Sequence, residues 1–158
     1  MSKTKKYNFY FNWILSNRLA IGTSPLKEDN VNFLISNGIK NIIGLCSVDE
    51  IGWHEQVESH FKTIRVVLPD SHSNDLPTFE QLQKAYNSLE EFVKDDITFI
   101  HCVASIERSP MLCILYVMKK YNITLENSLD YVKRMHKYTN PTNSQLKTLN
   151  KYAKDLIS

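Results

Sequence analysis

Residues 97–117 read ITFIHCVASIERSPMLCILYV and carry the most informative pattern in this chain of 158 residues. The first five residues are mostly apolar and predict a strand, while Met111 to Val117 is apolar on almost every side and predicts a central, buried helix. The segment from Cys102 to Arg108 must therefore turn the chain between the end of a strand and the start of a helix. Ser109 followed by Pro110 suits an N-cap and first-turn pair for that helix.

A turn of this kind has chemical consequences for Cys102 and Arg108. Free N–H groups in a tight loop and at a helix start can converge on an anion. The positive end of the helix dipole favours a thiolate over a thiol, so Cys102 is expected to ionise more readily than an ordinary cysteine. Arg108 offers a planar, permanently charged fork for two phosphoryl oxygens. His101 and the Ser109 hydroxyl could add hydrogen bonds around the loop or the sulfur.

These residues together predict a phosphate-binding site with a nucleophile at its base. The catalytic candidates are Cys102, Arg108 and Ser109, and His101 is a supporting residue. The phosphate would be bound by Arg108 and by the loop residues before it, Val103, Ala104, Ser105, Ile106 and Glu107.

The rest of the chain alternates strand-like and helix-like segments. Strands are expected at 12–15, 19–21, 42–46, 64–68 and 97–101. Helices are expected at 26–37, 49–61, from Thr78 onward with Gln81 completing a capping box, at 111–117, 124–137 and 143–157. This alternation predicts an α/β fold with a central, mostly parallel sheet of about four to five strands flanked by helices.

Composition narrows the class of protein. Hydrophobic residues make up 42% and charged residues 23%, and the formal net charge is +2, so nothing argues for nucleic acid or a membrane surface as partner. The length suits a single domain at residues 9–158 after a polar tail at 1–8. Three cysteines without metal-ligand spacing favour free thiols in the cytoplasm. The longest apolar run, 111–118, is too short to span a bilayer. The oligomeric state is left open.

The stretch His101-Cys-x5-Arg-Ser109 resembles the signature loop of the cysteine-based protein phosphatases, and its Arg-Ser-Pro ending resembles the dual-specificity branch. The resemblance implies a protein-tyrosine-phosphatase-like fold and a two-step reaction without metal or other cofactor. The cysteine attacks phosphorus to give a phosphocysteine, which water then hydrolyses. Two positions depart from the common loop: Ser105 stands where glycine is usual, and Glu107 occupies a variable position. If position 105 needs a positive φ, serine there costs strain.

The resemblance also points to the general acid. The segment Leu68-Pro-Asp70-Ser-His72-Ser-Asn-Asp75-Leu is similar to the Asp-x-His-x-x-Asp pattern of several dual-specificity phosphatases, in which the first aspartate protonates the leaving oxygen. Asp70 is therefore the expected acid, and Asp75 is the alternative. Without the cysteine loop, either aspartate would be regarded as a turn former.

Further segments resemble the same family and extend the likeness over nearly the whole chain: Leu19–Gly22, Gly38–Leu45 and Pro141–Leu146. Cys46 follows a strand whose carboxyl end is expected at the same sheet edge as the signature loop. A tensin-homologue lipid phosphatase has a cysteine in a similar setting that pairs with the nucleophile on oxidation. Cys46 is thus either a resolving thiol that protects Cys102 or a buried core residue.

The expected function is a protein phosphatase that acts on phosphotyrosine, with phosphoserine and phosphothreonine left open as further substrates. One alternative keeps the chemistry but changes the substrate to a phosphoinositide or an RNA 5′-phosphate. It ranks lower because the loop from 103 to 107 contains no lysine for a strongly anionic substrate. Another alternative is a non-catalytic phosphate-binding adaptor, which the presence of Cys102, Arg108 and an acid candidate disfavours.

Overall fold

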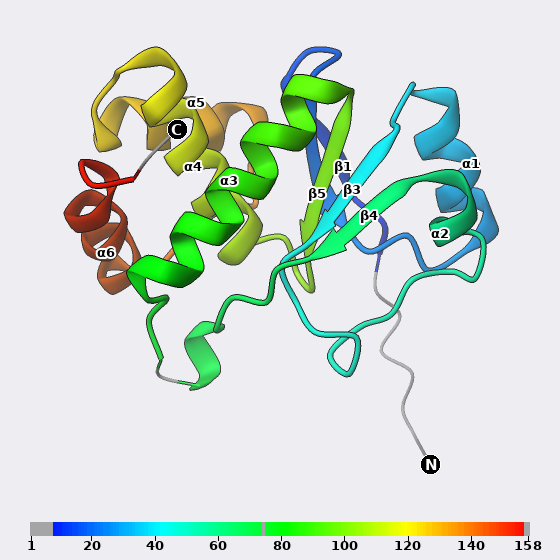
Figure 1. Cartoon of the computed structure of the whole chain (residues 1–158), viewed down its shortest axis with the longest axis horizontal. Coiled ribbons are helices and arrows are strands. Elements are labelled where there is room, and N and C mark those ends of the chain that lie inside the picture. Colours follow the sequence, from blue (N-terminus) through cyan, green and yellow to red (C-terminus); the bar gives the residue numbers. More distant parts are fainter. Residues whose placement is uncertain (1–7, 74, 157–158) are drawn as a thin grey trace.

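The protein is described here by a computed structural model covering residues 8–73 and 75–156. Within these residues a five-stranded sheet has the order β1-β2-β5-β3-β4 (Figure 1). The strands are β1 (Phe11–Leu15), β2 (Leu19–Thr23), β3 (Asn41–Gly44), β4 (Lys62–Arg65) and β5 (Thr98–Cys102). The expected α/β fold with a mostly parallel sheet is confirmed. The expected tail at 1–8 falls almost wholly outside the described residues.

The strands β2, β5, β3 and β4 run parallel, and β1 pairs antiparallel with β2 at one edge. Because β5 lies between β2 and β3, its carboxyl end is surrounded by neighbouring strand ends and the loops that follow them. In α/β sheets this edge is where ligands bind. The segment after β5, residues 103–107, opens at this edge.

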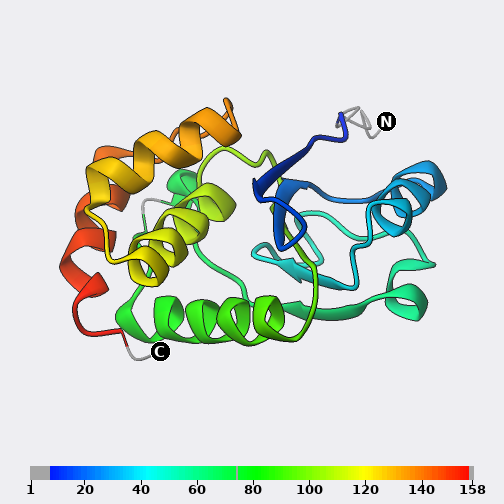
Figure 2. The same ribbon diagram turned by 90° about the horizontal axis from the view of Figure 1, so that it is seen from above.

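The helices cover both faces of the sheet, as Figures 1 and 2 show. On one face lie α1 (Glu28–Ser36) and the short α2 (Val57–His60). On the other lie α3 (Phe79–Asp95), α4 (Arg108–Tyr121), α5 (Leu125–Met135) and α6 (Asn143–Ala153). Each face has its own apolar core, and the larger core is formed around α4.

The buried helix expected from the apolar run is α4, in which every residue from Arg108 to Met118 is buried. The capping box of α3 is also present: the Thr78 side chain accepts from the backbone N–H of Gln81, and the Gln81 side chain accepts from the N–H of Thr78. None of the helices in the described part of the chain is long and apolar enough to cross a membrane.

Two expectations about helices are wrong. The helix expected at 49–61 exists only as α2. Ser47 and Glu50 close a turn instead. The backbone at 51–54 also bonds to distant residues; the N–H of His54, for example, donates to the Pro25 carbonyl. The start of α4 is also earlier than expected. Its N-cap is Glu107, whose carbonyl accepts the first helical hydrogen bond from Met111, so Ser109 lies inside the first turn.

The strand expected at 64–68 is shifted to β4, which ends at Arg65. Val66 and Leu68 still donate backbone hydrogen bonds to Gly44 and Leu45, but these bonds no longer form a regular ladder. The chain thereby leaves the sheet early and carries residues 68–73 toward the loop after β5.

Candidate active site

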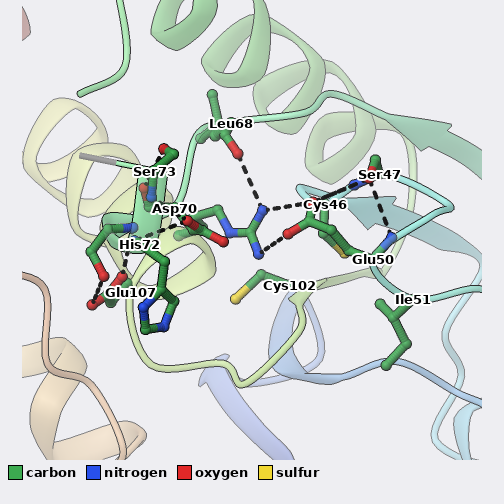
Figure 3. A network of polar contacts seen from close by, with 12 residues as sticks. Cys46, Ser47, Glu50, Ile51, Leu68, Asp70, His72, Ser73, Cys102 and Glu107 are labelled. Carbon is green, nitrogen blue, oxygen red and sulfur yellow. Dashed lines mark hydrogen bonds and ion pairs between the residues drawn. The ribbon is translucent and has the colours of Figure 1, made fainter. Parts of the chain in front are cut away.

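The loop after β5 forms one wall of a cavity of about 450 Å³. Cys102 is the last residue of β5, residues 103–107 bend sharply, and Arg108 is the first residue of α4. The cavity is lined by Cys102, Val103, Ala104, Ile106, Glu107 and Arg108 from this segment, and by Glu50, Asp70 and His72 from elsewhere. The structure thus brings the predicted nucleophile, arginine and acid into one cavity. Figure 3 shows Cys102 and Asp70 among the polar contacts around it.

Ser109 reaches the nucleophile from the first turn of α4. Its Oγ lies 3.1 Å from Cys102 Sγ, and both side chains are buried. When the cysteine is a thiolate, the hydroxyl must be the donor, because a thiolate carries no proton. Ser109 therefore stabilises the charged sulfur although it does not cap the helix.

The guanidinium of Arg108 is held by two partners from outside the loop. Nη1 and Nη2 donate to the Glu50 carboxylate over 3.1 and 2.9 Å, and Nη1 also donates to the Leu68 carbonyl over 3.2 Å. Among the described residues, Nε and the second hydrogen of Nη2 have no partner. That edge of the fork remains available for two phosphoryl oxygens.

The ion pair shifts both groups toward their charged forms. Burial lowers the pKa of Arg108, but the hydrogen bonds that it donates to Glu50 and the charge of Cys102 outweigh burial and leave that pKa above its ordinary value. Burial raises the pKa of Glu50, and the bonds from Arg108 and Ser47 reverse this and bring it below the usual range. The pair therefore stays ionised near neutral pH.

His101 supports the nucleophile through the backbone. The buried ring accepts a 2.6 Å hydrogen bond at Nε2 from the indole N–H of Trp53, so its proton lies on Nδ1, 3.2 Å from the Cys102 carbonyl. Burial lowers the pKa of His101 to about 3. The ring is thus neutral and orients the peptide that carries the predicted nucleophile, Cys102.

Asp70 lines the same cavity from the segment after β4 and caps a short turn, η1 (Ser71–Ser73). Its Oδ1 accepts from the backbone N–H groups of His72 and Ser73, over 3.0 and 3.1 Å. Within the described residues Oδ2 has no hydrogen-bond partner. Asp75, the alternative acid, instead lines a separate cavity with Leu76 and Gln145. Because Asp70 lines the cavity that holds Cys102 and Asp75 does not, the structure favours Asp70 over Asp75 as the candidate general acid.

Glu107 joins the two loops. Its carboxylate accepts from the Ser71 hydroxyl over 2.8 Å and from the Ser71 backbone N–H over 3.4 Å. The residue was expected only as part of the phosphate loop. Its side chain also connects that loop to the segment that carries Asp70.

Ser105 differs from the other loop residues. Its φ is +59°, in the left-handed region expected from the family's glycine, and its side chain is buried away from the cavity. The Ser105 hydroxyl and carbonyl lie 3.1 and 2.7 Å from Nε2 of His136. A left-handed conformation costs a non-glycine residue about 1–2 kcal/mol. His136 therefore contacts Ser105 where the backbone is strained.

Cys46 is fully buried just after β3, next to the Arg65 side chain, whose Nη1 donates to the Cys46 carbonyl and lies 3.8 Å from its sulfur. Burial and then the nearby charge of Cys102 raise the pKa of Cys46 to about 11. The cysteine is therefore at the expected sheet edge and close enough to the nucleophile to feel its charge.

Comparison with known proteins places this site in a family. The family model for the dual specificity phosphatase catalytic domain matches residues 21–155. The chain belongs to this family. A probable dual specificity protein phosphatase of Dictyostelium discoideum is 34% identical over 92 residues, which cover 58% of this chain and 23% of that protein. The chain spans about a quarter of the length of the curated relatives it matches first.

Several solved structures share the fold of this chain. The active form of Tk-PTP superposes with a TM-score of 0.78 at 19% identity, covering 92% of this chain and 97% of that one. PTPMT1 in complex with PI(5)P gives 0.78 at 16% identity, covering 92% and 96%. These likenesses confirm the fold expected from the sequence.

Several residues of the site were not predicted. Glu50, Ser71 and Trp53 lie outside the signature loop. Glu50 and Trp53 are in a segment without a motif, and Ser71 stands at a variable position of the Asp-x-His-x-x-Asp pattern. Asn12 and His136 are equally distant in the sequence. No local signal marks them, because each acts through a contact that only the folded chain creates.

Proposed function

We propose that this dual specificity phosphatase domain hydrolyses phosphomonoesters through a phosphocysteine intermediate on Cys102. The observation that carries the proposal is the shared cavity: sulfur, the free edge of the Arg108 guanidinium and the Asp70 carboxyl all line one space of about 450 Å³. In-line displacement needs a nucleophile and an acid on opposite sides of phosphorus, with a cation beside the transferring oxygens.

In the first step the Cys102 thiolate forms a bond to phosphorus while the bond from phosphorus to the leaving oxygen breaks. Protonated Asp70 donates its proton to that oxygen. Arg108 and the backbone N–H groups of 103–107 bind the three equatorial oxygens, with Glu50 holding the guanidinium in orientation. In the second step Asp70 accepts a proton from water, which attacks phosphorus and releases phosphate and the thiolate.

The charges around the cavity favour a phosphoprotein as substrate, on tyrosine and also on serine or threonine. Among the described residues that line it, Arg108 is the one permanent cation, and Glu50, Asp70 and Glu107 contribute carboxyl groups. Such walls repel a substrate that carries several phosphates more strongly than a single phosphomonoester on a peptide. The phosphoinositide alternative has a structural neighbour in PTPMT1, which was crystallised with PI(5)P, but that likeness concerns the fold.

We further propose that residues 9–158 act as a single catalytic domain and that the protein works in the cytoplasm. The three free cysteines support a reducing compartment. Oxidation would then reach Cys102 first, and we propose Cys46 as the thiol that rescues it.

The test is turnover of a generic aryl phosphate in the presence of a chelator. We expect activity to vanish in Cys102→Ser and Arg108→Ala, and kcat to fall about 10²–10⁴-fold in Asp70→Asn, which cannot donate the proton. Glu50→Gln should lower kcat/KM by about 10–100-fold, because a charged hydrogen-bond pair contributes about 1.5–3 kcal/mol.

Asp75→Asn is the matched control and should retain activity, since Asp75 lines another cavity. Full activity of Cys102→Ser would overturn the mechanism. A comparison of phosphopeptides with phosphoinositide vesicles decides the substrate, and a preference for the vesicles would reverse our assignment.

A further inference from the structure

A chain of buried hydrogen bonds leads from the sulfur of Cys102 to the opposite side of the phosphate loop. Ser109 Oγ lies 3.1 Å from Cys102 Sγ and 3.5 Å from Ser105 Oγ. His136, at the C-cap of α5, contacts Ser105, and Asn12 of β1 contacts His136. These residues come from β1, from the segment between the end of β5 and the first turn of α4, and from the end of α5. The mechanism proposed above uses the Cys102 sulfur and the backbone of the loop, and it gives no role to Asn12 or His136.

The donor and the acceptor of each hydrogen bond in this series can be assigned. The Asn12 amide nitrogen lies 2.9 Å from Nδ1 of His136, so Nδ1 is the acceptor and the proton of the neutral ring lies on Nε2. Nε2 therefore donates to the Ser105 carbonyl over 2.7 Å. The Ser105 hydroxyl is then free to donate toward Ser109, whose own proton faces the sulfur. The two hydroxyl groups thus donate toward the sulfur, while Nε2–H of His136 fixes the Ser105 carbonyl.

His136 is suited to stay neutral in this place. Its side chain is fully buried, and that burial lowers its pKa, although the bond to Ser105 partly opposes the shift. A neutral ring with one donor and one acceptor matches the two partners it has. A protonated ring would place a second N–H against the Asn12 amide nitrogen.

The same contact acts on the strained backbone of the loop. Ser105 has φ +59°, which glycine adopts at no steric cost and serine does not. If Ser105 relaxed to an ordinary φ, its carbonyl would leave Nε2 of His136, and the backbone of the phosphate loop on either side would change direction. A strained loop of this kind persists only where its surroundings hold it.

We propose that Asn12 and His136 are positioning residues that hold Ser105 in its left-handed conformation, and so keep the phosphate loop and the Ser109–Cys102 contact in their reactive geometry. The inference deepens the proposed phosphatase function and rests on it. His136 here substitutes for the conformational freedom that glycine would provide at position 105.

The experiment compares His136→Leu, which removes the donor, with His136→Gln, whose amide N–H can replace Nε2–H. The readouts are kcat and KM for an aryl phosphate and the rate at which iodoacetamide alkylates Cys102 at pH 6, located by mass spectrometry. Protection by inorganic phosphate gives its Kd. We expect His136→Leu to lower kcat at least tenfold, to slow alkylation and to weaken phosphate binding, while His136→Gln stays within threefold of the wild type.

The same substitution made in a Ser105→Gly protein separates an effect on the loop conformation from a general loss of stability. In Ser105→Gly the left-handed conformation needs no support, so adding His136→Leu there should cost less than threefold. His60→Leu, at an exposed histidine of α2, is the control and should change nothing.

Equal losses from His136→Leu in both backgrounds would overturn the proposal, because they would show an effect independent of strain at 105. Wild-type alkylation and phosphate binding in His136→Leu would overturn it as well. If the wild type does not hydrolyse aryl phosphates, the proposed function fails on its own, while alkylation and phosphate protection still decide the role of His136.

Discussion

At the scale of single residues, burial distinguishes the three cysteines. Cys102 lines the cavity, whereas Cys46 and Cys113 are fully enclosed. Desolvation raises the pKa of Cys46 to about 11 and that of Cys113 further, so neither ionises near neutral pH. Cys46 differs from Cys113 in its position at the sheet edge, beside Arg65 and the nucleophile. The charge of Cys102 is one of the causes that raise the Cys46 pKa, and it is absent once Cys102 has become an electrophilic sulfenic acid.

Treatment with mild peroxide tests the role of Cys46. We expect peroxide to convert the Cys102 thiolate to a sulfenic acid, which Cys46 then attacks to form a disulfide with loss of water. Non-reducing peptide mapping should find the Cys46–Cys102 disulfide, and thiol treatment should restore activity. In Cys46→Ser the recovery should fall severalfold, while Cys113→Ser behaves as the wild type. Absence of the disulfide would leave Cys46 as a core residue.

At the scale of elements, the pairing of β1 with β2 depends on the glycine at position 22. Gly22 pairs with Phe11, and a Cβ built there would lie 1.8 Å from the Tyr10 carbonyl oxygen. That oxygen also accepts the backbone hydrogen bond of Thr23. Only glycine lets the edge strand approach this closely, and β1 in turn carries Asn12 to the rear of the phosphate loop.

Gly22→Ala should therefore lower the free energy of unfolding by about 2–3 kcal/mol, because a methyl group forced into a packed site displaces backbone rather than a flexible side chain. Urea denaturation measures the effect. Gly52→Ala is the matched control, since a Cβ at Gly52 meets no atom within 4 Å. A loss at Gly22 no larger than that at Gly52 would contradict this account of the strand pair.

At the scale of the whole molecule, burying histidines under the active-site loop makes stability depend on pH. His101 and His136 both have pKa values below 6.5, the first lowered to about 3. Below pH 6.5 the unfolded chain binds more protons at these rings than the folded chain does. Stability is therefore complete above pH 6.5 and is lost as pH falls, by up to about 1.4 kcal/mol per pH unit for each histidine.

Urea denaturation between pH 7.5 and 4.5 tests this linkage. The free energy of unfolding should decline through the window, and the slope should be reduced in His101→Gln. His60→Gln, at an exposed histidine, should keep the wild-type slope. An unchanged slope in His101→Gln would show that this ring does not remain neutral in the folded protein.

The amino-acid sequence alone determined the turn from Cys102 to Arg108, the fold class and the buried helix α4, because each depends on local order: a strand, a short turn and an apolar run, or the alternation of strands with helices. It also placed Asp70, through a short motif. Only the tertiary structure decided three further contacts. They are the ion pair of Glu50 with Arg108, the hydrogen bond from Ser71 to Glu107 and the hydrogen bond from His136 to Ser105. These contacts join residues 31 to 58 positions apart. Hydrogen bonds at such separations depend on how the chain closes around the sheet, and no periodicity along the sequence encodes that.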